Sequence, residues 1–289
     1  MSTFGILGSG FGIYGYLPAL LNLGHFVLIP EQYQDKINER PELGPYLDKL
    51  EYSTEKRIID ICDNLVVARN PQRQYELVSK ITNNKQKLLL EKPLAPTLEM
   101  HRKLLKKLTT SNFDFSVGYL FQYTPWWREI TKGFCASTPL VTEINWKISK
   151  PSGWKEIPNL GGGIPDYYGI HFVPILQISG VQFQPSDVVS SKNSMLAIFR
   201  NRTGAKLKVR IEYSNKSLFS VTTASPKGER RNIFSDASPF GHLPIPNSPD
   251  PRISVLEEYI SSSDRIPKLL QSRLRLEENV LLFRKAFLQ

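Results

Sequence analysis

The sequence predicts a two-domain α/β protein, with a parallel-sheet domain over residues 1–120 and an α+β domain with a mostly antiparallel sheet over residues 121–289. Three observations predict this. An apolar run near the N-terminus ends in a cluster of glycines, similar runs then alternate with helical patterns, and after about residue 125 the strands change to two-residue alternation. Strands that alternate with helices indicate a parallel sheet, whereas period-two strands indicate a sheet with one buried face.

In the first domain, apolar runs typical of buried parallel strands occur five times. They are residues 4–7, 26–29, 65–68, 87–90 and 113–117. Helical patterns separate them, at residues 16–21, 74–82 and 98–108. Parallel strands joined in this way need right-handed crossovers, so the order of elements predicts one continuous parallel sheet.

In the second domain, alternation with a period of two predicts five strands. They are residues 141–148, 187–191, 195–199, 207–213 and 219–223, with turn signals at 201–204 and 225–228. Two helices close the chain, at residues 253–261 and 267–287, and the last has the apolar stripe of an amphipathic helix.

Composition narrows the function classes. The net charge of +10 comes from 37 basic and 27 acidic residues that are scattered along the chain, so it favours an anionic small-molecule substrate over a nucleic acid. Two cysteines and four widely spaced histidines show no metal-ligand spacing, which predicts no metal site. No apolar stretch is long enough for a membrane span and no signal-peptide pattern is present, so we expect a cytoplasmic protein without a membrane partner.

The glycine turn after the first strand predicts a pyrophosphate site. Gly8, Ser9 and Gly10 lie between a buried strand and a helix, where the backbone can approach a phosphate and the helix N-terminus meets its charge. The turn departs from the GxGxxG pattern, because Ile13 takes the place of the third glycine. The alternative is a tight structural turn without a ligand.

Glu31 follows the second strand, about 20 residues after the turn. An acidic residue there would bind the ribose hydroxyls of NAD and repel the 2′-phosphate of NADP, so the sequence favours NAD, with NADP as the alternative. Pro30 could instead shift the loop and leave Glu31 solvated. The cofactor site predicted from the sequence comprises Gly8, Ser9, Gly10, Phe11, Gly12, Glu31, Arg69, Asn70, Glu91 and Lys92.

Lys92 stands directly after the strand at residues 87–90, in the tripeptide Glu91-Lys92-Pro93. The carboxyl end of a central parallel strand is where ligands bind in open α/β sheets. A lysine ammonium there can hydrogen-bond a substrate hydroxyl and assist its proton transfer. The alternative is an ordinary surface lysine.

Four motifs together resemble the glucose–fructose oxidoreductase / inositol dehydrogenase (Gfo/Idh/MocA) family. They are the GxG turn, LLLEKPLAPT, SVGYLFQYTPWW and GGGIPDYYGIHF, which occur in family order between residue 5 and about residue 176. The resemblance implies an N-terminal Rossmann domain and a C-terminal domain on a large open sheet, through which members often form homo-oligomers. It also implies an NAD(P)-dependent oxidoreductase of sugars, inositols or nucleotide sugars.

The resemblance assigns catalytic roles to three residues. Lys92 matches the family lysine, and His171 matches the histidine beside the reacting carbon. Tyr167 stands where many members have an aspartate, four residues before the histidine, while Asp166 would face elsewhere, since one residue of a helix is about 100° of rotation. Tyr167 and His171 would share one helix face, and a tyrosine can exchange protons; the alternative is that Tyr167 and Tyr168 only pack.

The predicted substrate contacts are Tyr119, Trp154, Lys155 and Tyr168. The leading hypothesis is hydride transfer to or from a carbon of a sugar or nucleotide sugar, in carbohydrate or surface-polysaccharide biosynthesis. The alternatives are a non-catalytic cofactor-binding regulator or scaffold on the same fold, and a reductase of a non-sugar substrate.

Overall fold

The computed structural model describes residues 2–135, 140–178, 180–242, 250–263 and 270–287. It divides into two compact units. The first comprises Met1–Ala95, Glu99–Gly118 and Pro244–Leu270, and the second comprises Pro96–Leu98, Tyr119–Leu243 and Gln271–Gln289. The division at Gly118/Tyr119 lies close to the boundary expected after residue 120, but the segment from Pro244 to Leu270 lies in the first unit.

The first unit is built on a six-stranded parallel sheet. Its strands are β1 (Thr3–Leu7), β2 (Phe26–Pro30), β3 (Leu50–Ser53), β4 (Asn64–Val67), β5 (Lys87–Leu90) and β6 (Asp114–Val117). They are ordered β3-β2-β1-β4-β5-β6, which is the Rossmann order, so the predicted fold class is confirmed. The sequence pattern missed β3, because this edge strand is only half-buried and lacks an apolar run.

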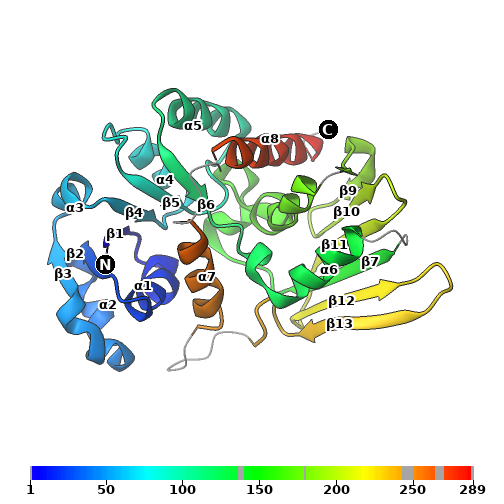
Figure 1. The fold of residues 1–289 in the computed structure, drawn as a ribbon, viewed down its shortest axis with the longest axis horizontal. Helices are drawn as coiled ribbons and strands as arrows, with labels where there is room; N and C mark the ends of the chain where they lie inside the picture. The colour runs from blue at the N-terminus through cyan, green and yellow to red at the C-terminus, as the bar shows by residue number, and fades with distance from the viewer. Residues whose placement is uncertain (1, 136–139, 179, 243–249, 264–269, 288–289) are drawn as a thin grey trace. The chain divides into compact units, whose positions relative to one another are not determined.

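Helices cover both faces of this sheet (Figure 1). On one face lie α1 (Leu17–Asn22) and α2 (Gln34–Asn38), and on the other α3 (Glu55–Ile61), α4 (Pro71–Val78) and α5 (Leu98–Thr110). The start of α4 is set by Asn70, whose side chain accepts a hydrogen bond from the Arg73 N–H, and by Pro71 in the first turn. This helix therefore begins and ends earlier than the predicted range of 74–82.

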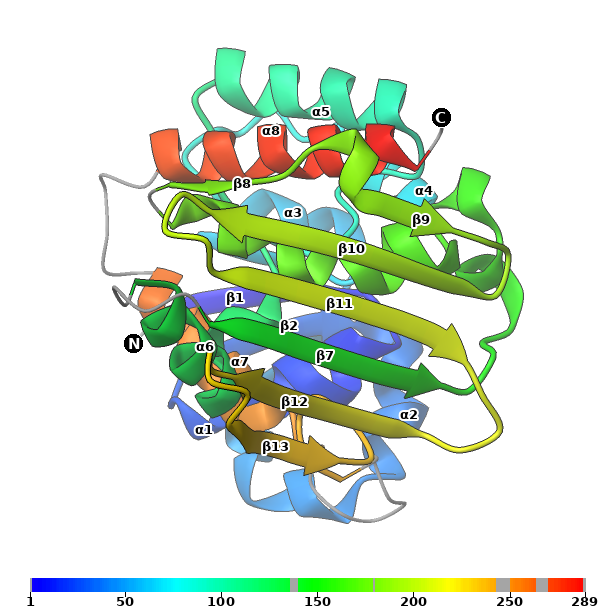
Figure 2. The same ribbon diagram turned by 90° about the vertical axis from the view of Figure 1, so that its right-hand side faces the viewer.

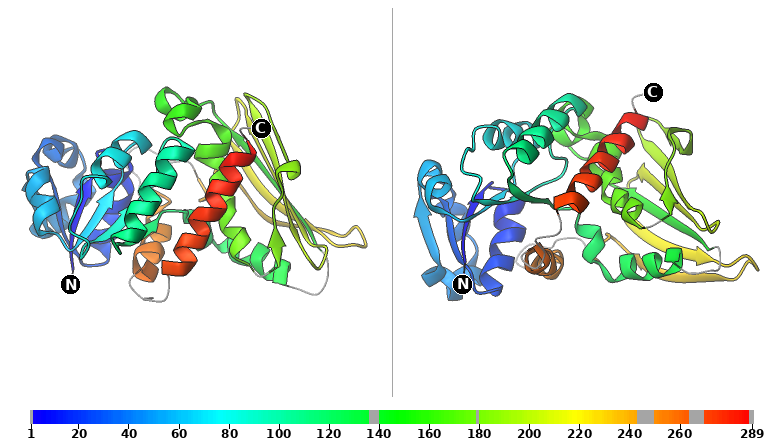
Figure 3. Two further views of the ribbon diagram at one scale, coloured as in Figure 1. Left: turned by 90° about the horizontal axis from the view of Figure 1, so that it is seen from above. Right: turned by 45° about the horizontal axis from the view of Figure 1, so that its top comes forward.

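The helix α7 (Ile253–Ser263) packs against α1 (Figure 3). Its apolar side chains Leu256 and Ile260 are fully buried, and the Tyr259 hydroxyl lies 2.8 Å from the Ser116 hydroxyl. These contacts explain why a segment late in the sequence belongs to the first unit. No local pattern encodes such a pairing, so the sequence assigned this helix to the second domain.

The second unit is built on a seven-stranded, mostly antiparallel sheet (Figure 2). Its strands are β7 (Val141–Ile148), β8 (Val181–Gln182), β9 (Val188–Ser190), β10 (Ser194–Asn201), β11 (Lys206–Tyr213), β12 (Leu218–Ala224) and β13 (Arg230–Asp236). The order is β13-β12-β7-β11-β10-β8, with β9 paired to β10, and only β7 and β11 run parallel among these pairs. The short β8 and the polar edge strand β13 were not predicted.

One face of this sheet holds the core of the second unit. Along β7 every second side chain is buried, as the alternation predicted. The longer helices described in this unit are α6 (Pro125–Cys135), α8 (Leu270–Ala286) and a 3-10 helix over Gly169–Gln177. Aromatic rings fill the space: Trp126 packs on Phe219 and Phe121, with ring centroids 4.9 and 5.2 Å apart. Figure 2 shows the opposite face of the sheet without a covering helix.

A buried ion pair fixes α8 within the second unit. The Arg284 guanidinium donates two hydrogen bonds to the Asp166 carboxylate, at 3.0 and 2.9 Å, and a third to the Pro96 carbonyl at 2.6 Å. The side chain of Arg284 is only 2% exposed. A charge so enclosed depends on its partner, because such bonds replace the hydration that it has lost.

We predict that Asp166→Asn lowers the free energy of unfolding by about 3–5 kcal/mol, because it leaves the buried guanidinium without its counter-charge. Asp187→Asn is the matched control: Asp187 also accepts two bonds from one arginine, but that partner, Arg200, is 44% exposed. The control should lower the free energy of unfolding by less than about 1 kcal/mol. Chemical denaturation followed by tryptophan fluorescence measures both, and equal losses would contradict the role assigned to Asp166.

Candidate functional site

The glycine turn follows β1 and leaves one open position. A Cβ on Gly8 would lie 2.2 Å from the Ala68 carbonyl oxygen, so only glycine lets these two backbones approach. A Cβ on Gly10 would meet nothing within 4 Å, and the Gly10 residue is exposed. The chain then enters a π-helix, Gly12–Tyr16, whose Ile13 N–H donates to the Gly10 carbonyl. Gly8 is thus required by the fold, while the Gly10 position is open toward a ligand.

Two arginines that the sequence did not single out lie beside this turn. The Arg252 guanidinium lies 4.1 Å from the centre of the Phe11 ring and is held by the Asp250 carboxylate, with Nε to Oδ1 at 2.8 Å. Arg40 donates to the Ile13 carbonyl and is paired with Glu42. Neither residue had a sequence signal, because each reaches the turn from a distant part of the chain.

Three further residues of the predicted cofactor site lie after β2 and β4: Glu31, which was predicted to bind the ribose, and Arg69 and Asn70. Glu31 is exposed and begins the 3-10 helix Glu31–Tyr33 directly after β2. Arg69 forms an ion pair with Glu55, which also accepts a hydrogen bond from Gln32 at 3.3 Å. These contacts bring Arg69 next to the segment after β2. The side chain of Asn70 instead caps α4, which is a structural role.

Glu91 and Lys92 follow β5, and a buried glutamine holds their loop in place. Gln74 is fully buried; its side chain accepts from the Glu91 N–H at 2.9 Å and donates to the Glu91 carbonyl at 2.7 Å. The same amide donates to the Leu94 carbonyl at 3.1 Å. Lys92 is buried, and a cis peptide bond joins it to Pro93. The sequence missed Gln74, since a glutamine in a helical pattern has no distinctive signal.

The Glu91 carboxyl has a perturbed environment. The Tyr16 hydroxyl donates to Glu91 Oε1 at 2.8 Å. Burial raises the pKa of Glu91 above its ordinary value, while the charge of Lys92, the Tyr16 hydrogen bond and the charge of Arg252 act in the opposite direction. A carboxyl between two cations and in a desolvated position is typical of functional sites in α/β sheets.

In the second unit, three of the predicted substrate and acid–base residues come together. The Tyr167 ring packs edge-on against Trp154 with centroids 5.3 Å apart, and the Lys155 ammonium lies 5.3 Å from the same ring. A Cβ on Gly162 would lie 2.3 Å from the Trp154 carbonyl oxygen, so this glycine lets the Trp154–Lys155 segment approach. We call Trp154, Lys155 and Tyr167 the aromatic cluster.

The segment that carries Tyr167 and His171 is not an α-helix. Tyr167 lies in a π-helix, Ile164–Tyr168, and His171 in the 3-10 helix Gly169–Gln177, which contains Pro174. The expectation that both residues share one α-helical face is therefore wrong, because an internal proline cannot donate the backbone bond that an α-helix needs. His171 is buried and its ring stacks on Phe121, with centroids 4.3 Å apart.

The other two predicted substrate residues are enclosed. Tyr119 is fully buried, and its hydroxyl donates to the Glu277 carboxylate of α8 at 3.2 Å. Tyr168 is half-buried next to Trp146 and Tyr167, and burial, followed by the neighbouring Tyr167 and Tyr213, raises the pKa of its hydroxyl. Asp166, one position before the family aspartate, is the partner of Arg284.

Among the described residues, no three His, Cys, Asp or Glu side chains gather closely enough to hold a metal ion. Within the same residues, every helix is too short or too polar to cross a membrane.

Comparisons with known proteins match the N-terminal part of the chain to a family model and the whole chain to a known fold. Residues 3–119 match the model of an oxidoreductase family with an NAD-binding Rossmann fold, Gfo/Idh/MocA. The structure is similar to a myo-inositol dehydrogenase from Corynebacterium glutamicum, with a TM-score of 0.68 at 12% identity over 100% of this chain and 96% of that chain. No curated protein matches the sequence significantly.

Two further solved structures share the fold. A dehydrogenase from Clostridium difficile has a TM-score of 0.67 at 15% identity, over 97% of both chains. The WlbA dehydrogenase from Thermus thermophilus, solved in complex with NAD and UDP-GlcNAcA, has a TM-score of 0.65 at 13% identity, over 100% of this chain and 94% of that chain.

We predict that Glu91→Gln stabilises the protein increasingly as the pH rises. In the unfolded chain a glutamate ionises near pH 4.3, whereas in the folded protein burial raises the pKa of Glu91. Below about pH 4.3 the Glu91 carboxyl is protonated in both the folded and the unfolded protein. As the pH rises from there toward the raised pKa, the free energy of unfolding of the wild type falls, whereas that of the glutamine variant is unaffected by this group. The difference between the melting temperature of the variant and that of the wild type should therefore increase from pH 4.5 to pH 8.

The exposed Glu229→Gln is the control, and its melting temperature should follow that of the wild type across this range. A constant difference between Glu91→Gln and wild type at all pH values would refute the role of Glu91 ionisation.

Proposed function

Residues 3–119 match the Gfo/Idh/MocA oxidoreductase family model with its NAD-binding Rossmann fold, and from this premise we propose that the chain transfers a hydride between a nicotinamide cofactor and a carbon of a sugar or nucleotide sugar. The observation that carries the proposal is the loop after β5, where buried Gln74 fixes the backbone around Lys92 at the carboxyl edge of the sheet. That edge is where Rossmann domains bind dinucleotides.

The residues of the first unit fit a dinucleotide. The open space at Gly10 and the close approach at Gly8 are what a backbone needs to contact a pyrophosphate. When bound, the nicotinamide supplies or accepts the hydride, and the protein supplies position and electrostatics. Glu31 is exposed at the end of β2, which supports its proposed contact with the ribose and a preference for NAD.

Arg252 joins the proposed cofactor site as its main cation. Arginine has five N–H donors, and Asp250 uses two of them, from Nε and Nη2, which leaves three. The Asp250 carboxylate and the Phe11 ring hold the guanidinium in place before any ligand arrives. A fixed, planar donor next to the turn is well suited to a phosphate.

The proposed proton transfer uses Lys92 together with Tyr167 or His171. Lys92 would hydrogen-bond and polarise the reacting oxygen, and Tyr167 or His171 would exchange the hydroxyl proton. The Lys155 ammonium lies 5.3 Å from the centre of the Tyr167 ring, a cation–π contact that holds the two side chains together. Trp154 offers an aromatic face of the kind that packs on a sugar ring.

The sugar class rests on the aromatic cluster and on the basic charge of the chain. It is supported by WlbA, a protein of similar fold that was solved in complex with NAD and UDP-GlcNAcA. A role in carbohydrate or surface-polysaccharide biosynthesis is part of the proposal. We also propose that copies of the chain associate through the uncovered face of the second sheet, where Lys208 pairs with Glu143.

The second candidate is a cofactor-binding regulator without catalysis. One observation favours it: the carboxylate nearest the family position, Asp166, is committed to Arg284. A regulator would bind the cofactor without converting any substrate. The measurements below distinguish such a regulator from an enzyme.

For cofactor binding, we predict that Gly10→Ala lowers the affinity for NADH at least about tenfold while the melting temperature stays unchanged, because the added methyl group fills only the ligand's space. Arg252→Gln should also lower the affinity about tenfold, as loss of one charged hydrogen bond does. Titration of NADH followed by fluorescence measures both.

Arg275→Gln is the control for Arg252→Gln, because it also removes one positive charge but lies at an exposed position of α8. It should leave the affinity for NADH unchanged. If NADH and NADPH both fail to bind the wild type, or if Gly10→Ala binds NADH normally, the proposed cofactor site is wrong.

For catalysis, we predict that Lys92→Met and His171→Asn each lower kcat by about 10²–10⁴-fold on the active sugar, with NADH affinity retained. Methionine keeps the aliphatic part of the buried lysine side chain. Tyr167→Phe separates the two proton-transfer candidates, because it lowers kcat only if the Tyr167 hydroxyl takes part. The assay follows NADH absorbance with a panel of free sugars, sugar acids and nucleotide sugars, and NADH binding without turnover on any of them would favour the regulator.

A further inference from the structure

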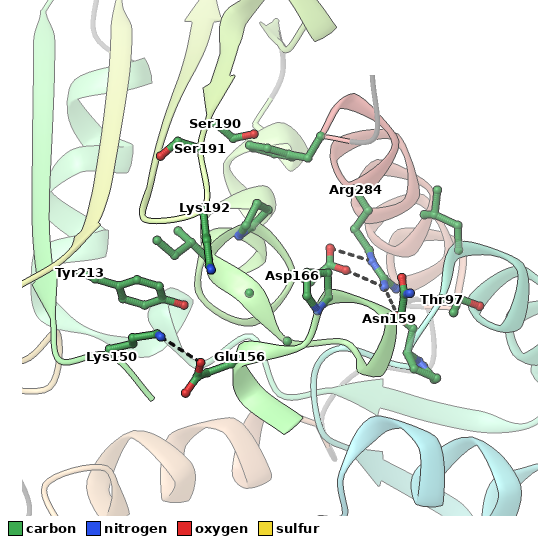
Figure 4. Close-up of a pocket in the computed structure, with 18 residues that line it drawn as sticks. Thr97, Lys150, Glu156, Asn159, Asp166, Ser190, Ser191, Lys192, Tyr213 and Arg284 are labelled. Atoms are coloured by element: carbon green, nitrogen blue, oxygen red, sulfur yellow. Dashed lines mark hydrogen bonds and ion pairs between the residues drawn. The ribbon is translucent and has the colours of Figure 1, made fainter. Parts of the chain in front are cut away.

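The second unit contains a cavity of about 370 Å³ that the residues discussed so far do not explain. Part of its wall is apolar and includes Pro158, Ile164 and Phe287. Lys150, Lys192 and Tyr213 also line the cavity and lie near one another in Figure 4. None of the aromatic cluster residues lines it, and neither does His171. The cavity is therefore a separate feature of this unit.

A rigid hairpin turn presents Lys192 to the cavity. The Ser191 hydroxyl accepts hydrogen bonds from the backbone N–H groups of Asn193 and Ser194, at 3.2 and 3.1 Å. The Tyr213 N–H donates to the Asn193 carbonyl at 2.9 Å, which ties this turn to β11. Figure 4 shows the Lys192 ammonium and the Tyr213 hydroxyl both directed into the cavity.

The cavity has an excess of one positive charge. Lys150 is paired with Glu156 at 3.2 Å, and Arg284 with Asp166 at 2.9 Å, so these four charges compensate one another. Within the part of the chain that the structure describes, no hydrogen bond or ion pair joins Lys192 to another residue. Its ammonium therefore attracts an anion, with a strength that salt reduces.

Tyr213 adds a neutral donor next to this charge. Burial, and after it the nearby Glu156 charge, raises the pKa of the Tyr213 hydroxyl, so the group is protonated at neutral pH and can donate to an anion. The hydroxyls of Ser190 and Ser191 and the amide of Asn159 also line the cavity and match the hydroxyls of a sugar.

We propose that this cavity binds a monosaccharide that carries one acidic group, a carboxylate or a phosphate, with the acid on Lys192 and Tyr213 and the ring against the apolar wall. The volume is near the lower end of the range of about 300–1,000 Å³ found for ligand pockets, which suits a single sugar better than a dinucleotide. The proposal uses none of the cofactor-site residues, so it stands independently of the proposed oxidoreductase activity.

Isothermal titration calorimetry with glucuronate, glucose 6-phosphate and glucose tests the site and distinguishes the two acidic groups. We expect at least one acid to bind saturably, glucose to bind at least tenfold more weakly, and the affinity for the acid to fall with added NaCl. Lys192→Met should weaken the acid at least tenfold and Tyr213→Phe about threefold. Because Lys192 is exposed, its variant should fold normally, which the melting temperature checks.

Two controls separate this cavity from other sites. Lys227→Met removes an exposed lysine from the hairpin between β12 and β13 and should leave binding unchanged. Trp154→Ala removes the aromatic face proposed for the reacting sugar and should leave the binding event that depends on Lys192 unchanged. If neither acid binds, if glucose binds equally well, or if Trp154→Ala abolishes binding while Lys192→Met does not, the proposal is overturned.

Discussion

The parallel sheet of the first unit imposes the constraint on which its proposed site depends. Because all six strands run in the same direction, their carboxyl ends lie at one edge. The glycine turn follows β1, Glu31 follows β2, Arg69 comes shortly after β4 and Lys92 follows β5. Four segments that are far apart in the sequence are thus delivered to a common edge, and each side chain only needs the right position relative to the end of its own strand.

Buried polar contacts then define how the Lys92 loop is held. Gln74 hydrogen-bonds the N–H and carbonyl of Glu91 and the carbonyl of Leu94, and each such bond avoids the cost of leaving a polar group unsatisfied in a protein interior. The ionised form of Glu91 is destabilised by burial, which raises the pKa of this carboxyl. The Lys92 charge, the Tyr16 hydrogen bond and the Arg252 charge act in the opposite direction and favour the charged form. We interpret this balance as stability given up to keep a carboxyl next to Lys92 and the glycine turn, a compromise typical of functional sites.

The sequence predicted what short-range patterns encode and missed what depends on distant partners. The strands β1, β2, β4 and β5 were found because strands buried on both faces are continuous apolar runs, whereas the edge strands β3 and β13 have mixed, partly exposed sequences. The positions of Glu31 after β2 and Lys92 after β5 agree with the prediction, because each follows directly from the end of a predicted strand. Arg252, which reaches Phe11 from beyond the second sheet, and the packing of α7 on α1 depend on tertiary contacts that no window of the sequence contains.

The second unit shows how one substitution redistributes chemistry among neighbouring residues. With tyrosine at position 167, the segment places a phenol beside Trp154 and Lys155, while the carboxylate of Asp166 turns to the buried Arg284 and serves stability. The aspartate typical of the family would supply a negative charge to this cluster, and here a neutral hydroxyl and a nearby ammonium stand instead. The cluster thus carries the positive charge of Lys155 without a carboxylate at position 167. A separate excess of positive charge surrounds Lys192, so the two sites proposed above would each attract an anion through groups of their own.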